Sequence, residues 1–248
     1  MTVPARSLII PMKDEATRIG STLRALQASG ILEEQPTELL LVDDGSTDGT
    51  PAIAEDVLRE LDLAARVIRL PRNVGKGGAI QAGVAASTGE VVAFSDADLS
   101  APPSAIEATY ELVEAGKADM VVTTRVHPES VMPVKPSNTR RYGGKALNIW
   151  IRALGLTDLN DTQCGLKAYT GDAARTLYAH LRAKRFAFDV EVIARAERAG
   201  YTVLELPIEW SHVEASRVRP FRDGVRMALD VLWLRWLLWR DERSSTAR

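Results

Sequence analysis

Two short apolar runs that end in acidic clusters constrain the fold of this chain more than any other feature. They are residues 38–44 (ELLLVDD) and residues 91–98 (VVAFSDAD). Such uninterrupted apolar runs are typical of strands buried on both faces of a parallel sheet. In open α/β sheets, ligands bind where such strands end. Two acidic clusters there would repel each other unless they shared a cation or a donor-rich ligand, so the sequence indicates a metal-bridged, phosphate-bearing substrate.

The first half of the chain alternates apolar runs with segments of helical spacing, separated by short loops. The predicted strands are 7–12, 39–42, 66–70, 91–95 and 120–124, and the predicted helices are 15–29, 50–61, 79–87 and 102–115. This alternation predicts an α/β fold with a mostly parallel central sheet and helices on both faces.

The second half has a looser pattern. Residues 127–139 contain three prolines and no periodicity, which predicts a long loop. The further predicted elements are helices at 142–154, 190–199 and 220–240 and strands at 165–170 and 201–210. Asp189 is expected to cap the helix that follows it.

Charge and cysteine content exclude several classes of protein. A formal net charge of -2 and the lack of alternating basic and aromatic residues argue against nucleic acid as a partner. Cys164 is the only cysteine, so no intrachain disulfide is expected and the cytoplasm is the expected compartment. The N-terminus lacks the apolar stretch of a signal peptide, and no run reaches the about 18 to 20 apolar residues of a membrane span.

The acidic cluster after the second apolar run suits a metal ion. Asp96 and Asp98 are spaced i, i+2, which places both carboxylates on the same side of an extended segment. Such a pair can hold a hard divalent cation and leave positions open for diphosphate oxygens. The alternative is a solvated turn at a strand end, where Asp is common in any case.

Two further loops also have both a ligand-binding and a purely structural interpretation. Residues 43–50 (DDGSTDGT) suit hydrogen bonds from a ribose or a base, or else form a glycine turn before a capped helix. Residues 73–79 (NVGKGGA) offer Lys76 and helix N-terminal amides to a negative charge, or else form a flexible turn. The second loop matches neither the P-loop nor the dinucleotide fingerprint.

The order of these motifs along the chain is more specific than any motif alone. The motifs that follow successive strands are 10–15 (IPMKDE), 42–48 (VDDGSTD), 73–77 (NVGKG) and 95–98 (SDAD). In this order, residues 7–125 resemble the nucleotide-sugar-binding half of a family 2 glycosyltransferase of the GT-A fold. Residues 72–79 and 161–167 (DTQCGLK) resemble the polyprenyl-phosphate sugar synthases, particularly the dolichyl-phosphate glucosyltransferase branch.

The resemblance implies a domain organisation. It implies one GT-A catalytic domain, 1–219, with a nucleotide-sugar-binding half (1–125) and an acceptor half (126–219). A C-terminal amphipathic helix and tail, 220–248, would follow.

The resemblance also implies roles for the matching residues. Those implied in binding the nucleotide-sugar are Pro11, Lys13, Glu15, Asp43, Asp44, Gly75, Lys76, Asp96 and Ala97. Asp98, together with Asp96, would bind Mg²⁺ or Mn²⁺ between the two phosphates. The candidates for the acceptor phosphate are Arg125, Arg141, His212, Arg217 and Arg219. Asp98, Arg125 and Asp161 are the expected catalytic residues, with Asp161 orienting the sugar or a basic partner.

Three residues depart from the pattern of the family. Lys13 stands where relatives often have an aromatic residue that stacks on the base, and Asp14 where many have Asn, which leaves the base open. Ser100 replaces a Gln that follows the acidic motif in the mannosyl-phosphate branch. This last change favours a UDP-sugar, such as UDP-glucose, over GDP-mannose.

The expected reaction is an inverting, metal-dependent transfer of a hexose to a polyprenyl phosphate. Inversion needs the acceptor oxygen in line behind the anomeric carbon and stabilisation of charge on the departing diphosphate. A lipid phosphate is already an anion, so the site needs cations more than a general base. The alternatives are a GDP-mannose donor, a soluble acceptor, and a non-catalytic protein that binds a nucleotide-sugar.

The predicted C-terminal helix carries three of the five tryptophans, Trp233, Trp236 and Trp239, together with Arg235 and Arg240. This is the composition of a helix at a membrane interface. We expect peripheral contact with the cytoplasmic face of a membrane through residues 220–240. The alternatives are packing on the domain core or against a second subunit, which would make the protein a homo-oligomer.

Overall fold

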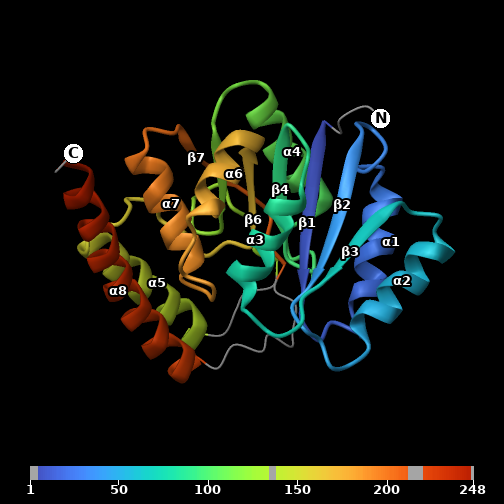
Figure 1. Ribbon diagram of the computed structural model, residues 1–248, viewed down its shortest axis with the longest axis horizontal. Coiled ribbons are helices and arrows are strands. Elements are labelled where there is room, and N and C mark those ends of the chain that lie inside the picture. The colour runs from blue at the N-terminus through green and yellow to red at the C-terminus, as the bar shows by residue number, and fades with distance from the viewer. Residues whose placement is uncertain (1–4, 134–137, 212–219, 247–248) are drawn as a thin grey trace.

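The computed structural model describes residues 5–133, 138–211 and 220–246, which form a central sheet with helices on both faces (Figure 1). The strands are β1 (Arg6–Met12), β2 (Thr37–Asp43), β3 (Ala65–Arg69), β4 (Val91–Ser95), β5 (Met120–Thr124), β6 (Leu166–Thr170) and β7 (Val203–Pro207). They lie in the order β3-β2-β1-β4-β6-β5-β7. Strand β6 runs antiparallel to β4 and β5, whereas the other pairs are parallel. The predicted α/β fold with a mostly parallel sheet is therefore confirmed.

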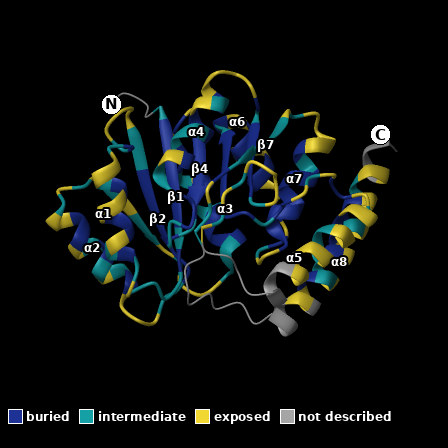
Figure 2. Cartoon of the chain, turned by 180° about the vertical axis from the view of Figure 1, so that it is seen from behind, coloured by how far each residue is buried: buried dark blue, intermediate teal, exposed yellow. Residues whose placement is uncertain are grey.

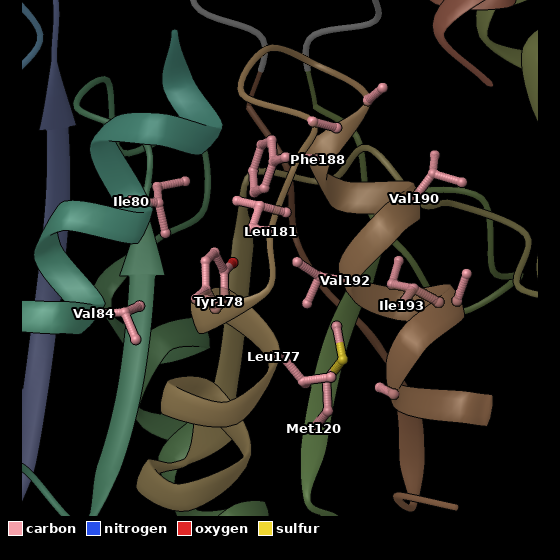
Figure 3. Packing of buried hydrophobic residues seen from close by; sticks show 14 of the residues in the cluster. Ile80, Val84, Met120, Leu177, Tyr178, Leu181, Phe188, Val190, Val192 and Ile193 are labelled. Carbon is pink, nitrogen blue, oxygen red and sulfur yellow. The ribbon is translucent and has the colours of Figure 1, made fainter. Parts of the chain in front are cut away.

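The helices divide between the two faces because successive strand residues point to opposite sides. They are α1 (Ile19–Ser29), α2 (Thr50–Glu60), α3 (Lys76–Ala86), α4 (Pro103–Glu114), α5 (Asn138–Ala153), α6 (Gly171–Ala179), α7 (Phe188–Arg198) and α8 (Pro220–Thr246). Ile9 and Leu40 belong to the core that α3, α6, α7 and α8 cover, whereas Leu8 and Leu39 belong to the core under α1, α2 and α4. Figure 3 shows the first core, in which side chains of α3, α6 and α7 meet.

The strand order fixes where a ligand can bind. The chain runs outward from β1 through β2 to β3 and then returns to place β4 on the other side of β1. A crevice forms outside the carboxyl ends of the strands at such a reversal. The loops after β1, β2 and β4 meet there, and they carry three of the four motifs.

Several helices differ from the prediction. The helix predicted at 79–87 begins at Lys76. Gly75, the residue before it, has a φ of 98° and is therefore not helical. The helix predicted from residue 142 begins at Asn138. Helix α6 is absent from the prediction, although its N-cap was a usable signal: the Thr170 side chain accepts a hydrogen bond from the Ala173 amide.

Helix α8 extends to Thr246, beyond the predicted end at residue 240. One face packs on the domain, since Met227, Val231, Leu234 and Leu238 are buried in the core that α7 shares. The C-terminal helix is therefore part of the folded body rather than a separate appendage. No helix in the described part of the chain is both long enough and apolar enough to cross a bilayer.

The opposite face of α8 exposes large apolar side chains. Trp233, Trp236 and Trp239 are 42%, 50% and 39% exposed. Helix α5 lies beside α8 (Figures 1 and 2) and exposes Ile149 and Trp150. The large apolar side chains that are exposed on these two helices, called here together the aromatic face, are Tyr142, Ile149, Trp150, Leu229, Leu232, Trp233, Trp236 and Trp239.

Candidate active site

The loops after β1 and β2 are tied together at the carboxyl ends of these strands. The Asp14 amide donates to Ser46 Oγ (2.8 Å), and the Asp14 carboxylate accepts from the Thr47 amide (2.7 Å). The second hydrogen bond is the main reason that the pKa of Asp14 falls to about 2. Lys13 Nζ donates to the Gly45 carbonyl (2.5 Å). Asp14 and Lys13, two departures from the family pattern, therefore fix the shape of this corner.

Two other residues predicted to bind the nucleotide lie on the same loop. Pro11 pairs with Val42 in the register of β1 and β2. The Glu15 amide donates to Thr50 Oγ1 (2.7 Å), and the Glu15 carboxylate is bound to Arg18 (2.6 Å). The structure thus brings Pro11, Lys13 and Glu15 next to the end of β2.

Asp43 and Asp44 are buried, and both carboxylates are engaged. Asp43 accepts from the Ser46 amide at 3.2 Å. Asp44 accepts from the amides of Val74 (2.6 Å) and Gly75 (2.9 Å). Burial raises the pKa of Asp44, and the two amides only partly offset this. Asp44 therefore links the β2 loop to the glycine-rich loop.

The glycine-rich loop serves packing within the protein. The Gly75 amide is bound by Asp44, and the Gly78 amide donates to the Lys184 carbonyl (3.1 Å). A Cβ added at Gly77 would lie 2.5 Å from Phe188 Cβ. The glycines therefore let residues 183–188 approach α3 closely, and the approach of a ligand to this backbone stays a prediction. Of the predicted groups in this loop, the Lys76 ammonium is the one that faces the acidic pair.

Lys76 is paired with the first residue of the acidic pair. Its Nζ lies 2.5 Å from Asp96 Oδ1. The other carboxylate oxygen, Oδ2, lies against Gly165, where an added Cβ would overlap it. The Phe94 ring lies below, with Lys76 Nζ 5.7 Å from its centroid. Asp96 is thus held between a lysine and a glycine.

Asp98 is the more available carboxylate of the pair. Its Oδ1 accepts from the Ser100 amide (3.0 Å), and it makes no ion pair with any described residue. Ala97 between the two is buried, while Asp96 and Asp98 are part-exposed. These residues form a turn, closed by the hydrogen bond from the Leu99 amide to the Asp96 carbonyl (3.1 Å), and not the predicted extended segment.

The acidic pair fits a hard divalent cation. No group of three or more His, Cys, Asp or Glu side chains in the described ranges could hold a metal by itself. Two carboxylates suit a cation that takes its other ligands from phosphate oxygens, which is how Mg²⁺ is usually bound.

A second charged pair lies at the end of β5. Arg125 binds Asp161 through two hydrogen bonds, from Nε (2.7 Å) and Nη2 (2.8 Å), and stacks on Trp210 at 5.1 Å. Burial alone would raise the pKa of Asp161, but Arg125 outweighs it and the pKa is lowered. Nη1 of Arg125 makes no hydrogen bond to a described residue and is free to bind an anion.

A third pair lies deeper. Lys167 Nζ lies 2.6 Å from Asp189 Oδ1, both side chains are buried, and Lys167 shares the Phe94 ring with Lys76. The expected cap at Asp189 is wrong, because α7 begins after Ala187 and has no side-chain cap. The sequence-based prediction does not include this pair, although a lysine inside the apolar run of β6 indicates a buried partner.

Some predicted residues cannot be placed. His212, Arg217 and Arg219 lie outside the described residues, and so does the side chain of Arg141, whose backbone belongs to α5. The structure brings together the other candidates, which are Pro11, Lys13, Glu15, Asp43, Asp44, Gly75, Lys76, Asp96, Ala97, Asp98, Arg125 and Asp161.

The acidic pair and the Arg125–Asp161 pair lie at the carboxyl edge of the sheet, where open α/β sheets bind their ligands. Residues 7–175 match glycosyl transferase family 2, so the chain belongs to this family and is a glycosyltransferase. The resemblance inferred from the four motifs is confirmed.

The relatives narrow the class. The dolichyl-phosphate beta-glucosyltransferase of Dictyostelium discoideum is 28% identical, over 93% of this chain and 73% of that protein. Dolichyl-phosphate beta-glucosyltransferase ALG5D of Trichomonas vaginalis is 31% identical, over 91% of this chain and 71% of that protein. The chain is therefore a family 2 glycosyltransferase related to dolichyl-phosphate glucosyltransferases.

Solved structures agree on the fold. Glucosyl-3-phosphoglycerate synthase from Mycobacterium tuberculosis, in complex with Mn²⁺, UDP and phosphoglyceric acid, has a TM-score of 0.69. It is 20% identical, with 93% of this chain and 77% of that chain covered. This likeness shows the GT-A fold.

Proposed function

We propose that the protein transfers a glucosyl group, with inversion, from UDP-glucose to the phosphate of a polyprenyl phosphate. The observation that carries this proposal is the Arg125 guanidinium, which Asp161 and Trp210 hold rigid near the acidic pair. Burial would lower the pKa of Arg125, but Asp161 and, to a smaller extent, Asp96 raise it. A fixed cation at that position suits an anionic acceptor. The names of the relatives support a lipid phosphate as that acceptor.

Asp161 acts as a positioning group in this proposal and not as a base. It is buried, deprotonated at neutral pH and bound to Arg125 by both oxygens. An acceptor phosphate is already an anion and needs no proton removed before it attacks. The arrangement therefore stabilises and aligns charge rather than moving a proton.

Asp98 and Asp96 are the proposed ligands of Mg²⁺ or Mn²⁺. Such an ion, when bound, neutralises the charge that develops on the departing diphosphate. The Mn²⁺ and UDP in the related solved structure support this choice of ion and nucleotide. Pro11, Lys13, Glu15, Asp43 and Asp44 are proposed to hold the uridine, with Gly75, Lys76 and Ala97 around the sugar and phosphates.

The aromatic face is proposed to lie on the membrane that holds the acceptor. Trp236 and Trp239 stack with Arg240 and Arg243 at 5.0 and 4.0 Å, so the exposed rings carry cations beside them. Tryptophan and arginine favour the headgroup region of a bilayer. Because the buried face of α8 belongs to the core, the protein would touch the bilayer peripherally, on its cytoplasmic side.

The reaction is tested with a panel of UDP-glucose, UDP-galactose and GDP-mannose, each with Mn²⁺ and either a polyprenyl phosphate or phosphoglyceric acid. We expect nucleoside diphosphate release with UDP-glucose and the polyprenyl phosphate, and labelled sugar in the organic phase. Label that stays in the aqueous phase with phosphoglyceric acid would reject the lipid acceptor. Release with GDP-mannose alone would reject the donor.

The membrane contact is tested by liposome co-sedimentation of the full chain with Trp233, Trp236 and Trp239 replaced by serine. We expect less binding than by the wild type to vesicles that contain anionic lipid. Truncation is a poorer test, because it would remove Leu234 and Leu238 from the core. Equal binding by both proteins would reject the contact.

A further inference from the structure

The carboxylates at the catalytic edge of the sheet differ in whether the protein already supplies a cation. Asp161 has Arg125, Asp189 has Lys167 and Asp96 has Lys76. Asp98 has no such partner among the described residues. Of the two carboxylates in the acidic pair, Asp96 is therefore neutralised by a side-chain cation of the protein and Asp98 is not.

The ion pair between Lys76 and Asp96 competes with the binding of a metal ion by Asp96. Oδ2 lies against Gly165, where an added Cβ would overlap it, so Oδ1 is the oxygen farther from that glycine. That oxygen is the one that Lys76 Nζ contacts at 2.5 Å. A divalent cation that ligates Asp96 must therefore displace the ammonium or suffer its repulsion.

The position of Lys76 gives the displaced ammonium another partner. Lys76 is the first residue of α3, so its side chain starts at the positive end of a helix and beside the acidic pair. A diphosphate held there would be within reach of the same flexible four-carbon stem. Lys167, on the other side of the Phe94 ring, is buried with Asp189 and has no such freedom.

We propose that the Lys76 ammonium pairs with Asp96 when neither metal ion nor nucleotide is bound, and moves to the donor diphosphate when the divalent ion binds. We call this the resident-cation role of Lys76. The inference rests on the metal site of the proposed function. In this role, Lys76 competes with the metal ion for Asp96 in the absence of nucleotide and binds the nucleotide once it is present. In the metal-free site, Lys76 would then keep Asp96 paired until the metal–nucleotide complex binds.

The test is a titration of Mn²⁺, followed by electron paramagnetic resonance, with wild-type protein, Lys76→Met and Lys76→Arg. Without nucleotide, we expect Lys76→Met to bind Mn²⁺ about three- to tenfold more tightly, because the competing part-exposed ion pair is gone. Lys76→Arg keeps the charge and should match the wild type. With saturating Mn²⁺, Lys76→Met should bind UDP about tenfold more weakly, since one charged contact to phosphate is lost.

The outcomes separate the two proposals. Equal or weaker Mn²⁺ binding by Lys76→Met, with binding by the wild type, would overturn the resident-cation role and leave the metal site intact. No Mn²⁺ binding by any of the proteins, with or without UDP, would overturn the metal site and this inference with it. The melting temperature of each variant, measured by circular dichroism, shows that Mn²⁺ affinities are compared between folded proteins.

Discussion

The two halves of the site are held by different kinds of interaction. In the loops after β1 and β2, backbone amides hold the shape, as in the hydrogen bonds that Asp14 and Asp44 accept. At the end of β5 and the start of β6, side-chain ion pairs hold it: Arg125 with the buried Asp161, and Lys167 with Asp189, both buried. The first half therefore suits the neutral, donor-rich nucleoside that we propose binds there, and the second half keeps charge fixed. Substitutions should damage the two halves in different ways.

The largest effect should come from Arg125→Ala. It removes the proposed acceptor cation and leaves the buried Asp161 carboxylate unpaired. We expect transfer to fall by about 10²- to 10³-fold, as for loss of one stabilising donor, and stability to fall by about 3–5 kcal/mol. Initial rates and urea unfolding measure the two effects.

Acidification gives a second check on the same pair. Because the folded-state pKa of Asp161 is lowered, its stabilisation is present above the unfolded value, near ~3.9, and is lost as pH falls through the folded value. Urea unfolding at several pH values should show this loss in the wild type and a smaller one in Arg125→Ala. Parallel pH profiles would contradict the role given to the pair.

Lys167→Met should affect stability more than chemistry. Its partner Asp189 would remain buried without a cation, at a cost of about 3–5 kcal/mol. The double substitution Lys167→Met with Asp189→Leu should recover most of this loss, because no charge is then left in the core. A double variant as unstable as the single one would mean that packing, rather than charge, explains the cost.

Gly77→Ala tests the contact between the start of α3 and Phe188 in α7. The added methyl would overlap Phe188, so we expect a loss of about 1–3 kcal/mol by urea unfolding. In the double variant with Phe188→Ala, the losses of stability from the two substitutions should be less than additive. Gly144→Ala, in α5, is the matched control: nothing lies within 4 Å of its added Cβ, and it should be neutral or slightly stabilising.

The smallest effect should come from Gly165→Ala. A methyl there would push on Asp96 Oδ2 without a strained backbone, so the acidic pair should shift while the fold persists. We expect about tenfold weaker binding of Mn²⁺ with UDP, equivalent to about 1.4 kcal/mol, at nearly constant melting temperature. Unchanged affinity would show that Asp96 is not confined by Gly165.

The contrast between the loops after the strands and the side-chain ion pairs also explains which parts of the site the sequence predicts well. Pro11, Asp44 and Asp98 sit in motifs directly after strands, so periodicity and order along the chain locate them at one edge of the sheet. Arg125 and Asp161, or Lys167 and Asp189, meet only through the antiparallel insertion of β6, which no local pattern shows. The packing of the glycine-rich loop escapes the sequence for a related reason: residues 183–188, which approach its backbone, lie far along the chain.

We expect transfer to a lipid phosphate to depend on Asp98, the carboxylate of the acidic pair that makes no ion pair with a described residue. The most direct measurement is the incorporation of labelled glucose from UDP-glucose into polyprenyl phosphate, in Mn²⁺, by wild-type protein and Asp98→Ala. Because Asp98 makes no ion pair in the described structure, the variant should keep its melting temperature. We predict that it loses at least about 10²-fold in organic-phase label. Full incorporation by a folded Asp98→Ala protein would contradict the account.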